Sequence, residues 1–290
     1  MRAACPNRSR SFLLVAAVVV LALLTVGCRP GEPATNLGPS RDAVLAAHQA
    51  VQSAATKLRT SDVSFTIDMS VTGWNTWRTH GTGQIMAEPS SSMAVDFPGM
   101  PVVPHWLYGG GNLQMILIDQ ALYVHASALS PEAARSIEAG GAQWQRMDLS
   151  HPQARLLGLD TIVGQARQYT PARQLEMLLA SADLASVATE TTGGIDTTRY
   201  EGAVRLRDAV RLPQFDDVAV RWVEEFFRVA QADLAQYVVW LDRDLRVRKV
   251  SVTMRSENGD LNMTMELSPP DSSIQILAPP RSAVDDMVMP

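Results

Sequence analysis

Cysteine is scarce in this sequence: among its 290 residues only Cys5 and Cys28 occur. Cys5 precedes an apolar run that has the features of an export signal, and cleavage of that signal would leave Cys28 as the single thiol. One thiol cannot form an intrachain disulfide. The sequence therefore excludes the class of small secreted domains that several disulfides hold together.

Residue patterns for metal binding and catalysis are also missing. The five histidines lie at least 20 residues apart, and no H-x-x-x-H, C-x-x-C or G-x-S-x-G pattern occurs. Asp242-x-Asp244 matches part of a calcium-ligand run, but no third ligand or glycine follows, so we favour a hairpin turn. We expect no catalytic residue, no metal ligand and no cofactor, and therefore no enzyme.

Positive charge is present but not clustered. The chain has 25 Lys+Arg against 30 Asp+Glu, for a formal net charge of −5, and Lys57 and Lys249 are its only lysines. A net acidic chain without a basic patch argues against nucleic acid as a partner. We expect a monomer that does not bind nucleic acid.

Long apolar runs are limited to one segment near the start. A basic segment with Arg2, Arg8 and Arg10 precedes an apolar run over residues 12–26. That run is shorter than the about 20 residues that span a bilayer. Gly27 followed by Cys28 departs from the A-x-A cleavage pattern and resembles the bacterial lipobox, in which the signal is cut before a diacylated cysteine.

We therefore expect residues 1–27 to be a lipoprotein signal peptide and Cys28 to carry the lipid. Acyl chains on Cys28 would hold the protein on the extracytoplasmic face of the plasma membrane. The alternative is an uncleaved membrane anchor. Residues 28–40 contain several Pro and Gly without apolar periodicity, which predicts a flexible tether between lipid and domain.

The rest of the sequence alternates between helical and strand periodicity. Residues 41–59 have one apolar stripe at 3–4 spacing, which predicts an amphipathic helix, and further helices are expected after Pro152, Thr170 and Asp216. Long strands with alternating side chains separate these helices. The pattern predicts an α+β fold in which helices cover one face of an antiparallel sheet.

Two strands have the cleanest alternation of apolar and polar side chains. Residues 63–71 place Phe65, Ile67 and Met69 on one face, and residues 261–267 do the same for a second set that includes Met263, Met265 and Leu267. Met adapts to irregular apolar ligands. These six residues are our candidates for the lining of a lipid cavity, and an ordinary closed core is the alternative.

The order of several segments resembles the actinobacterial LppX/LprG-type lipoproteins, which are relatives by fold of the LolA lipoprotein carriers. The likeness rests on Cys28 with its Pro/Gly tether and on five segments spread along the chain: SDVSFTIDMSVTG (61–73), WQRMDL (144–149), LLGLDTIV (156–163), TTGGIDTTRYEGAV (191–204) and YVVWLDRDLRVRKVSVTM (237–254). Residues 98–140 are a departure, because this stretch is longer than the family needs.

The resemblance implies a half-open antiparallel β-barrel with helices packed against its concave face and an apolar cavity between them. It also implies that the cavity holds acyl chains for the transfer or presentation of a lipid or lipoglycan in the cell envelope. On this basis residues 41–280 form the lipid-binding domain and residues 281–290 a disordered tail. The alternative is an envelope sensor or scaffold that uses the same fold to contact another protein.

Overall fold

The computed structural model describes residues 39–73, 76–87, 92–98, 112–152, 170–257, 259–268 and 275–287. These residues belong to one compact unit that extends from Pro39 to Pro290. The segment expected to be a signal peptide, the expected tether as far as residue 38, Cys28 and nearly all of the helix expected after Pro152 lie outside the described residues. None of the helices in the described ranges is both long and apolar enough to cross a membrane.

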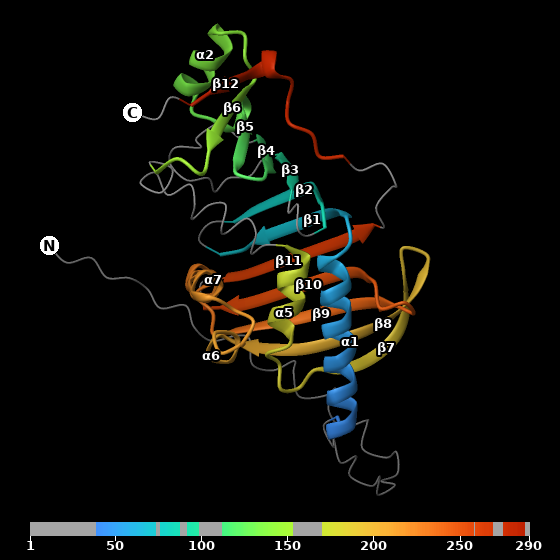
Figure 1. Cartoon of the computed structure of the whole chain (residues 1–290). Helices are drawn as coiled ribbons and strands as arrows, with labels where there is room; N and C mark the ends of the chain where they lie inside the picture. Colours follow the sequence, from blue (N-terminus) through green and yellow to red (C-terminus); the bar gives the residue numbers. More distant parts are fainter. Residues whose placement is uncertain are drawn as a thin grey trace, which may run out of the picture. The chain divides into compact units, whose positions relative to one another are not determined.

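A single twelve-stranded sheet runs through this unit, in the order β12-β6-β5-β4-β3-β2-β1-β11-β10-β9-β8-β7 (Figure 1). The strands are β1 (Val63–Val71), β2 (Trp77–Ile85), β3 (Met93–Pro98), β4 (Asn112–Ile118), β5 (Ala121–His125), β6 (Trp144–Asp148), β7 (Ala185–Thr192), β8 (Ile195–Arg205), β9 (Leu234–Asp242), β10 (Val247–Ser256), β11 (Gly259–Ser268) and β12 (Val284–Asp286). All neighbouring pairs are antiparallel except β12 with β6. The sheet is open, with β12 and β7 at its two edges.

Short connections explain why most neighbours in the sheet are also neighbours in sequence. Asp119, between β4 and β5, has φ 53°, and Gly193 and Gly194, between β7 and β8, have φ 57° and 79°. Two-residue hairpin turns require these left-handed conformations, which glycine adopts without strain. Two pairs are exceptions, because β1–β11 and β12–β6 each join segments that are far apart in the sequence.

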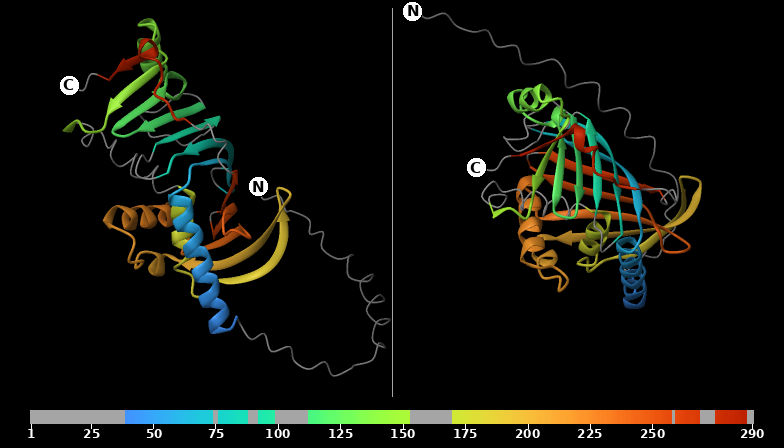
Figure 2. Two further views of the ribbon diagram at one scale, coloured as in Figure 1. Left: turned by 45° about the vertical axis from the view of Figure 1, so that its right-hand side comes forward. Right: turned by 45° about the horizontal axis from the view of Figure 1, so that its top comes forward.

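The helices are α1 (Arg41–Arg59), α2 (Pro131–Ala139), α5 (Pro171–Leu178), α6 (Leu206–Ala209) and α7 (Asp217–Ala230), with 3₁₀ turns η1 (Ala126–Ala128) and η2 (Arg281–Ala283). Ser40, Ser130, Thr170 and Asp216 each cap a helix by accepting a hydrogen bond from a backbone N–H in its first turn. Figure 2 shows α1 and α5 side by side on the concave side of strands β7–β11. The predicted α+β fold with an open antiparallel sheet and helices on its concave face is confirmed.

The C-terminal segment corrects one prediction. We expected residues 281–290 to be disordered, but η2 and β12 are ordered, and β12 pairs in parallel with β6. Gln143 N donates to Ala283 O at 2.9 Å, and Met287 N donates to Arg146 O at 2.9 Å. A strand of three residues is too short to show a period in the sequence, and its hydrogen-bond partner lies about 140 positions away, so local pattern could not reveal it.

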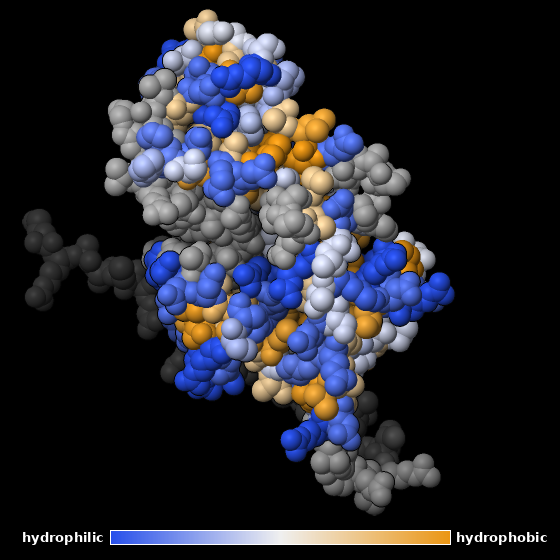
Figure 3. All heavy atoms as spheres, viewed as in Figure 1, coloured by the Kyte–Doolittle hydropathy of each residue, from blue (hydrophilic) through white to orange (hydrophobic). Residues whose placement is uncertain are grey.

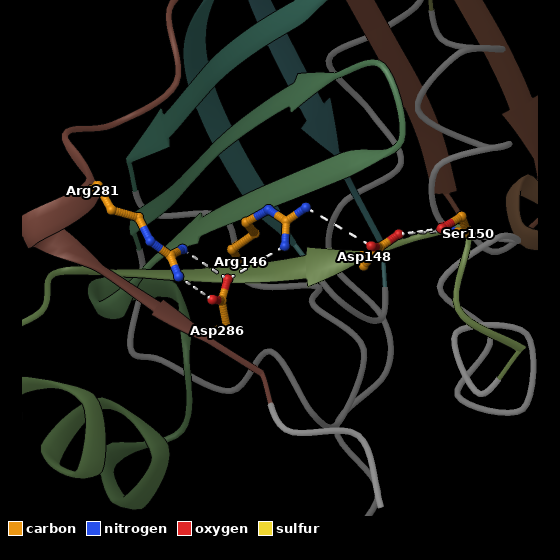
Figure 4. A network of polar contacts seen from close by, with 5 residues as sticks. All are labelled: Arg146, Asp148, Ser150, Arg281 and Asp286. Atoms are coloured by element: carbon orange, nitrogen blue, oxygen red, sulfur yellow. Dashed lines mark hydrogen bonds and ion pairs between the residues drawn. The ribbon is translucent and has the colours of Figure 1, made fainter.

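Charged side chains hold this edge of the sheet together (Figure 4). The Asp286 carboxylate accepts hydrogen bonds from Arg281 Nη1 at 3.1 Å and from Arg146 Nη1 at 3.4 Å. Asp148, two residues after Arg146 on β6, accepts from Ser150 Oγ at 2.6 Å. The Arg281 hydrogen bond holds the pKa of Asp286 below its usual value. These contacts join Arg281 and Asp286 to β6, the strand that begins at Trp144.

Candidate functional site

The six predicted cavity residues lie together as three cross-strand pairs between β1 and β11. Phe65 is opposite Leu267, Ile67 is opposite Met265, and Met69 is opposite Met263. Directly opposed side chains share a face of the sheet, so the six form one continuous apolar surface, here called the β1/β11 apolar face. The sequence predicted both halves of this surface, and the structure shows that they adjoin.

The β1/β11 apolar face continues across two further strands. Val250 and Val252 of β10 lie opposite Met265 and Met263, and Tyr237 of β9 lies opposite Val252. All three are at most 1% exposed. Four neighbouring strands thus present one apolar surface toward the helices.

On the other side of β1, strand β2 contributes glycines. A Cβ atom at Gly83 would lie 2.3 Å from Phe65 Cζ, and one at Gly81 would lie 2.3 Å from Phe97 Cδ1. The two aromatic rings therefore lie directly over the β2 backbone, in space that only glycine leaves open. A Gly-x-Gly within a strand pattern is a sequence signal for a close approach of this kind.

Five of the six residues of the β1/β11 apolar face are buried in this structure. Ile67 is 4% exposed, Met263 and Met265 are 1% exposed, and only Met69 of the six is half-buried. The residues of α1 and α5 in the same hydrophobic cluster are Ala47, Val51, Ala54, Ala55, Leu175, Met177 and Leu178. Helix α1 thus contributes mainly small side chains to this cluster, and α5 contributes larger ones. Trp222 and Phe226 lie four residues apart on α7, a spacing that predicts packing on the sheet, but their side chains lie outside what the structure describes.

A buried hydrogen bond joins Gln174 of α5 to Tyr237 of β9, whose ring continues the β1/β11 apolar face. Tyr237 Oη donates to Gln174 Oε1 at 3.3 Å, and Gln174 is 0% exposed. Burial raises the pKa of Tyr237, so its hydroxyl stays protonated and donates. Within the described part of the chain, Gln174 Nε2 has no hydrogen-bond partner. A buried donor without a partner lowers the stability of the folded protein by about 1–3 kcal/mol, so an acceptor placed near Nε2 would be stabilising.

The acidic pair near the β9–β10 connection forms a turn, as we favoured. The Asp242 carboxylate accepts hydrogen bonds from Asp244 N and Arg246 N, both at 2.9 Å, and from Arg248 Nη2 at 2.7 Å. Its oxygens are therefore engaged by donors of the turn itself. Among the residues that the structure describes, no group of three His, Cys, Asp or Glu side chains converges as a metal site would require.

A pocket of about 420 Å³ lies over β1 to β4 and the start of β6. Its lining includes Phe65 but none of the other five members of the β1/β11 apolar face. In the view of Figure 3 the surface over α1 is mostly hydrophilic, and hydrophobic residues lie in several separate places.

The arrangement of these features belongs to the class of open antiparallel sheets that hold helices in their concave side. Among solved structures, the chain is similar to the lipoprotein LppX of Mycobacterium tuberculosis, with a TM-score of 0.45 and 14% identity over 82% of this chain and 100% of that one. It is also similar to LprF of Mycobacterium bovis, with a TM-score of 0.44 and 9% identity over 83% of this chain and 99% of that one.

A third similar structure is a LolA-superfamily protein of Nitrosomonas europaea, with a TM-score of 0.29 and 9% identity over 78% of this chain and 94% of that one. No protein-family model matches the sequence, and no curated protein matches it either. The resemblance stated from the sequence is thus found again among solved structures. At these identities and TM-scores it carries no argument about ligand or function, which we take from the chain's own residues.

Proposed function

We propose that this protein is a lipoprotein, anchored through Cys28 on the extracytoplasmic face of the plasma membrane, which binds the acyl chains of a lipid or lipoglycan against the β1/β11 apolar face. In this role it would transfer or present the lipid within the cell envelope. One observation carries the proposal: three directly opposed apolar pairs, two of them containing Met, form a continuous surface beneath the helices. Acyl chains placed there would gain about 25 cal/mol for each Å² of apolar surface buried.

Uptake requires the helical cover to move, because Met263 and Met265 are 1% exposed in the closed structure. Helix α1 is suited to such movement. It buries Ala47, Ala54 and Ala55 against the cluster, and alanine loses less buried apolar area on separation than leucine would. Acyl chains would replace the contacts that the helix gives up, so the opened state is stabilised only when lipid is present.

Gln174 supplies a polar contact that acyl chains alone would not need. Its unpaired Nε2 is a donor, and the ester carbonyl of a diacyl lipid is an acceptor without a hydrogen of its own. Tyr237 fixes the amide by donating to its oxygen. This pairing favours an esterified lipid over a plain hydrocarbon as the ligand.

The anchor has its own test. Cys28→Ser removes the thiol that would be acylated, so radiolabelled palmitate fed to cells should label the wild-type protein and leave the variant unlabelled. Cys5→Ser is the matched control and should be labelled like the wild type. Equal incorporation in Cys28→Ser and wild type would contradict lipidation at Cys28, and an unlabelled wild type would favour the uncleaved anchor.

Lipid binding is tested with Met265→Glu and a control on the opposite face, Ser251→Glu, which lies on the neighbouring strand β10. The purified lipoprotein and both variants are assayed for uptake of a fluorescent diacyl lipid and for thermal unfolding. We expect uptake by the wild type and by Ser251→Glu and loss of uptake in Met265→Glu. The opposite result is a wild type that takes up no lipid and a Met265→Glu variant that is unfolded. It would show that this face is an ordinary closed core, and it would favour the sensor or scaffold role.

A further inference from the structure

The pocket of about 420 Å³ lies on the opposite side of the sheet from the β1/β11 apolar face. Ser64 and Thr66 line it, and they alternate along β1 with Phe65 and Ile67, so their side chains point the other way. Thr82 of β2 lies opposite Thr66 and continues the same surface. The volume lies within the range of pockets that bind small ligands.

The residues that line this pocket disfavour the binding of anions. Among the described residues that line it there is no Lys, Arg or His, and Asp96 of β3 is the one carboxylate. Hydroxyl and amide side chains supply most of its hydrogen-bonding groups, among them Gln84 and Gln114. A phosphate or carboxylate ligand would meet an acidic group with no cation to balance it, so the pocket suits a neutral ligand that has several hydroxyl groups.

Asp96 leaves one acceptor unused. Its Oδ2 accepts a hydrogen bond from Gln114 Nε2 at 3.1 Å. Its Oδ1 is buried and has no partner among the residues that the structure describes. A carboxylate oxygen without a donor is costly, and a ligand hydroxyl would satisfy it with a charge-assisted hydrogen bond. The Gln114 contact holds the carboxylate in place for that bond.

Trp144 adds an aromatic surface to these polar groups. It begins β6, and its ring contacts His125 of β5 in a T-shaped arrangement with the centroids 5.0 Å apart. Pairing of Val284 in β12 with Trp144 fixes the strand from its other side. A single indole beside hydroxyl, amide and carboxylate groups matches a sugar ring, which has apolar C–H faces and hydroxyls around its rim. Cages that bind quaternary ammonium groups use several aromatic rings instead.

We propose that this pocket binds a neutral sugar ring that stacks on Trp144 and donates a hydroxyl hydrogen bond to Asp96 Oδ1. The proposal does not rest on acyl binding, because the two surfaces lie on opposite faces of the sheet. The sugar can belong to a soluble oligosaccharide or to the headgroup of a glycolipid, since both present the same ring and hydroxyls.

The test uses the purified full-length lipoprotein in detergent and a panel of neutral disaccharides built from glucose, galactose and mannose. Binding is followed by saturation-transfer NMR and calorimetry. Trp144→Leu and Asp96→Asn should each weaken binding about tenfold, the size expected for loss of aromatic stacking or of a charge-assisted hydrogen bond. Thermal unfolding of each variant verifies that it is folded, and Asp96→Asn keeps the shape of the side chain if Trp144→Leu proves unstable.

Two matched controls lie on the same face of the sheet but outside the pocket. Asp68→Asn changes a carboxylate of β1, and Trp240→Leu removes an indole of β9. Both should bind sugar as the wild type does.

Vesicles of phosphatidylcholine with a diglucosyl diacylglycerol, compared with the soluble disaccharides, show which source binds more tightly. The proposal is overturned if no sugar of either source binds, if Trp144→Leu and Asp96→Asn bind like the controls, or if choline binds in place of sugar.

Discussion

Ile67 and Met265 face each other across the β1–β11 pair, and their exposed fractions are 4% and 1%. The two residues are nearly 200 positions apart in the sequence, so the surface they share exists only because the first and last long strands of the domain pair. This surface is buried in the structure. A lipid carrier built on it must therefore open, and its closed and loaded states should differ in the position of α1 or α5.

The contact between Gly83 and Phe65 gives the first prediction. A methyl group at Gly83 would lie 2.3 Å from Phe65 Cζ, so Gly83→Ala forces the ring out of its place. Overpacking of this kind costs about 1–3 kcal/mol. In a Phe65→Leu background the obstacle is gone, and the same change should cost much less. Chemical denaturation of the wild type, both single variants and the double variant measures the coupling.

If Gly83→Ala lowers the free energy of unfolding equally in the wild type and in the Phe65→Leu background, the ring does not lie over Gly83. Gly193→Ala is a useful comparison, because no atom lies within 4 Å of a Cβ built there. Its φ of 57° still makes the substitution unfavourable, but Phe65→Leu should leave that cost unchanged.

The Asp242 turn predicts how stability depends on pH. Burial alone would raise the pKa of Asp242, but hydrogen bonds from Arg246 N, Arg248 and Asp244 N outweigh it, so the pKa lies below its usual value. The unfolded chain therefore binds this proton more readily than the folded one. The stabilisation is complete well above the unfolded pKa of about 3.9 and is lost as the pH falls through the folded pKa.

Asp242→Ala removes one partner of a buried ion pair with Arg248 and should cost roughly 3–5 kcal/mol at pH 7. The difference between variant and wild type should shrink as the pH falls below about 4. Denaturant titrations at several pH values measure it. A difference that stays constant down to acid pH would contradict an ionised Asp242 in the folded protein.

The ordered C-terminal segment predicts an effect of truncation. Removal of residues 281–290 deletes β12 and exposes the edge of β6, together with the backbone groups of Gln143 and Arg146 that now bond to this segment. We expect a lower melting temperature and faster amide exchange in β6. The charge change Asp286→Asn should have a much smaller effect, because exposed ion pairs contribute about 0–1 kcal/mol. A truncation without effect would show that the segment is the disordered tail expected from the sequence.

The unpaired Nε2 of Gln174 predicts that a substitution at this residue weakens lipid binding more than it changes stability. Gln174→Leu removes a buried donor that has no partner in the described part of the chain, although it also takes the acceptor from Tyr237. These effects oppose each other, so stability should change by less than about 1–2 kcal/mol. Retention of an esterified lipid should fall. A variant that retains diacyl lipid as well as the wild type would remove Gln174 from the binding site.

Much of this fold follows from local pattern. The helix expected over residues 41–59 is α1, and the strand expected over residues 63–71 is β1, because both have a clean apolar period with a Ser cap or a turn at the boundary. The turns at Asp119 and at Gly193 have residue types that turn chemistry favours. Local period also identified which side chains of β11 share a face.

Features that depend on contacts between distant segments were not readable. The pairing of β12 with β6, the position of the Phe65 ring over Gly83 and the unpaired oxygen of Asp96 each join parts of the chain that are far apart or on different strands. A period in one strand cannot show which strand will lie beside it. The sequence therefore predicted the β1/β11 apolar face as two separate halves and did not identify the pocket beside Trp144.

The most direct test of acyl binding is photo-cross-linking with a diacyl lipid that carries a diazirine within one acyl chain. The purified protein is loaded from vesicles, irradiated and digested, and the modified residues are located by mass spectrometry, with excess unlabelled lipid as competitor. The account predicts competable adducts on Phe65, Ile67, Met69, Met263, Met265 or Leu267. Adducts confined to the opposite face of the sheet, or none that the competitor removes, would contradict it.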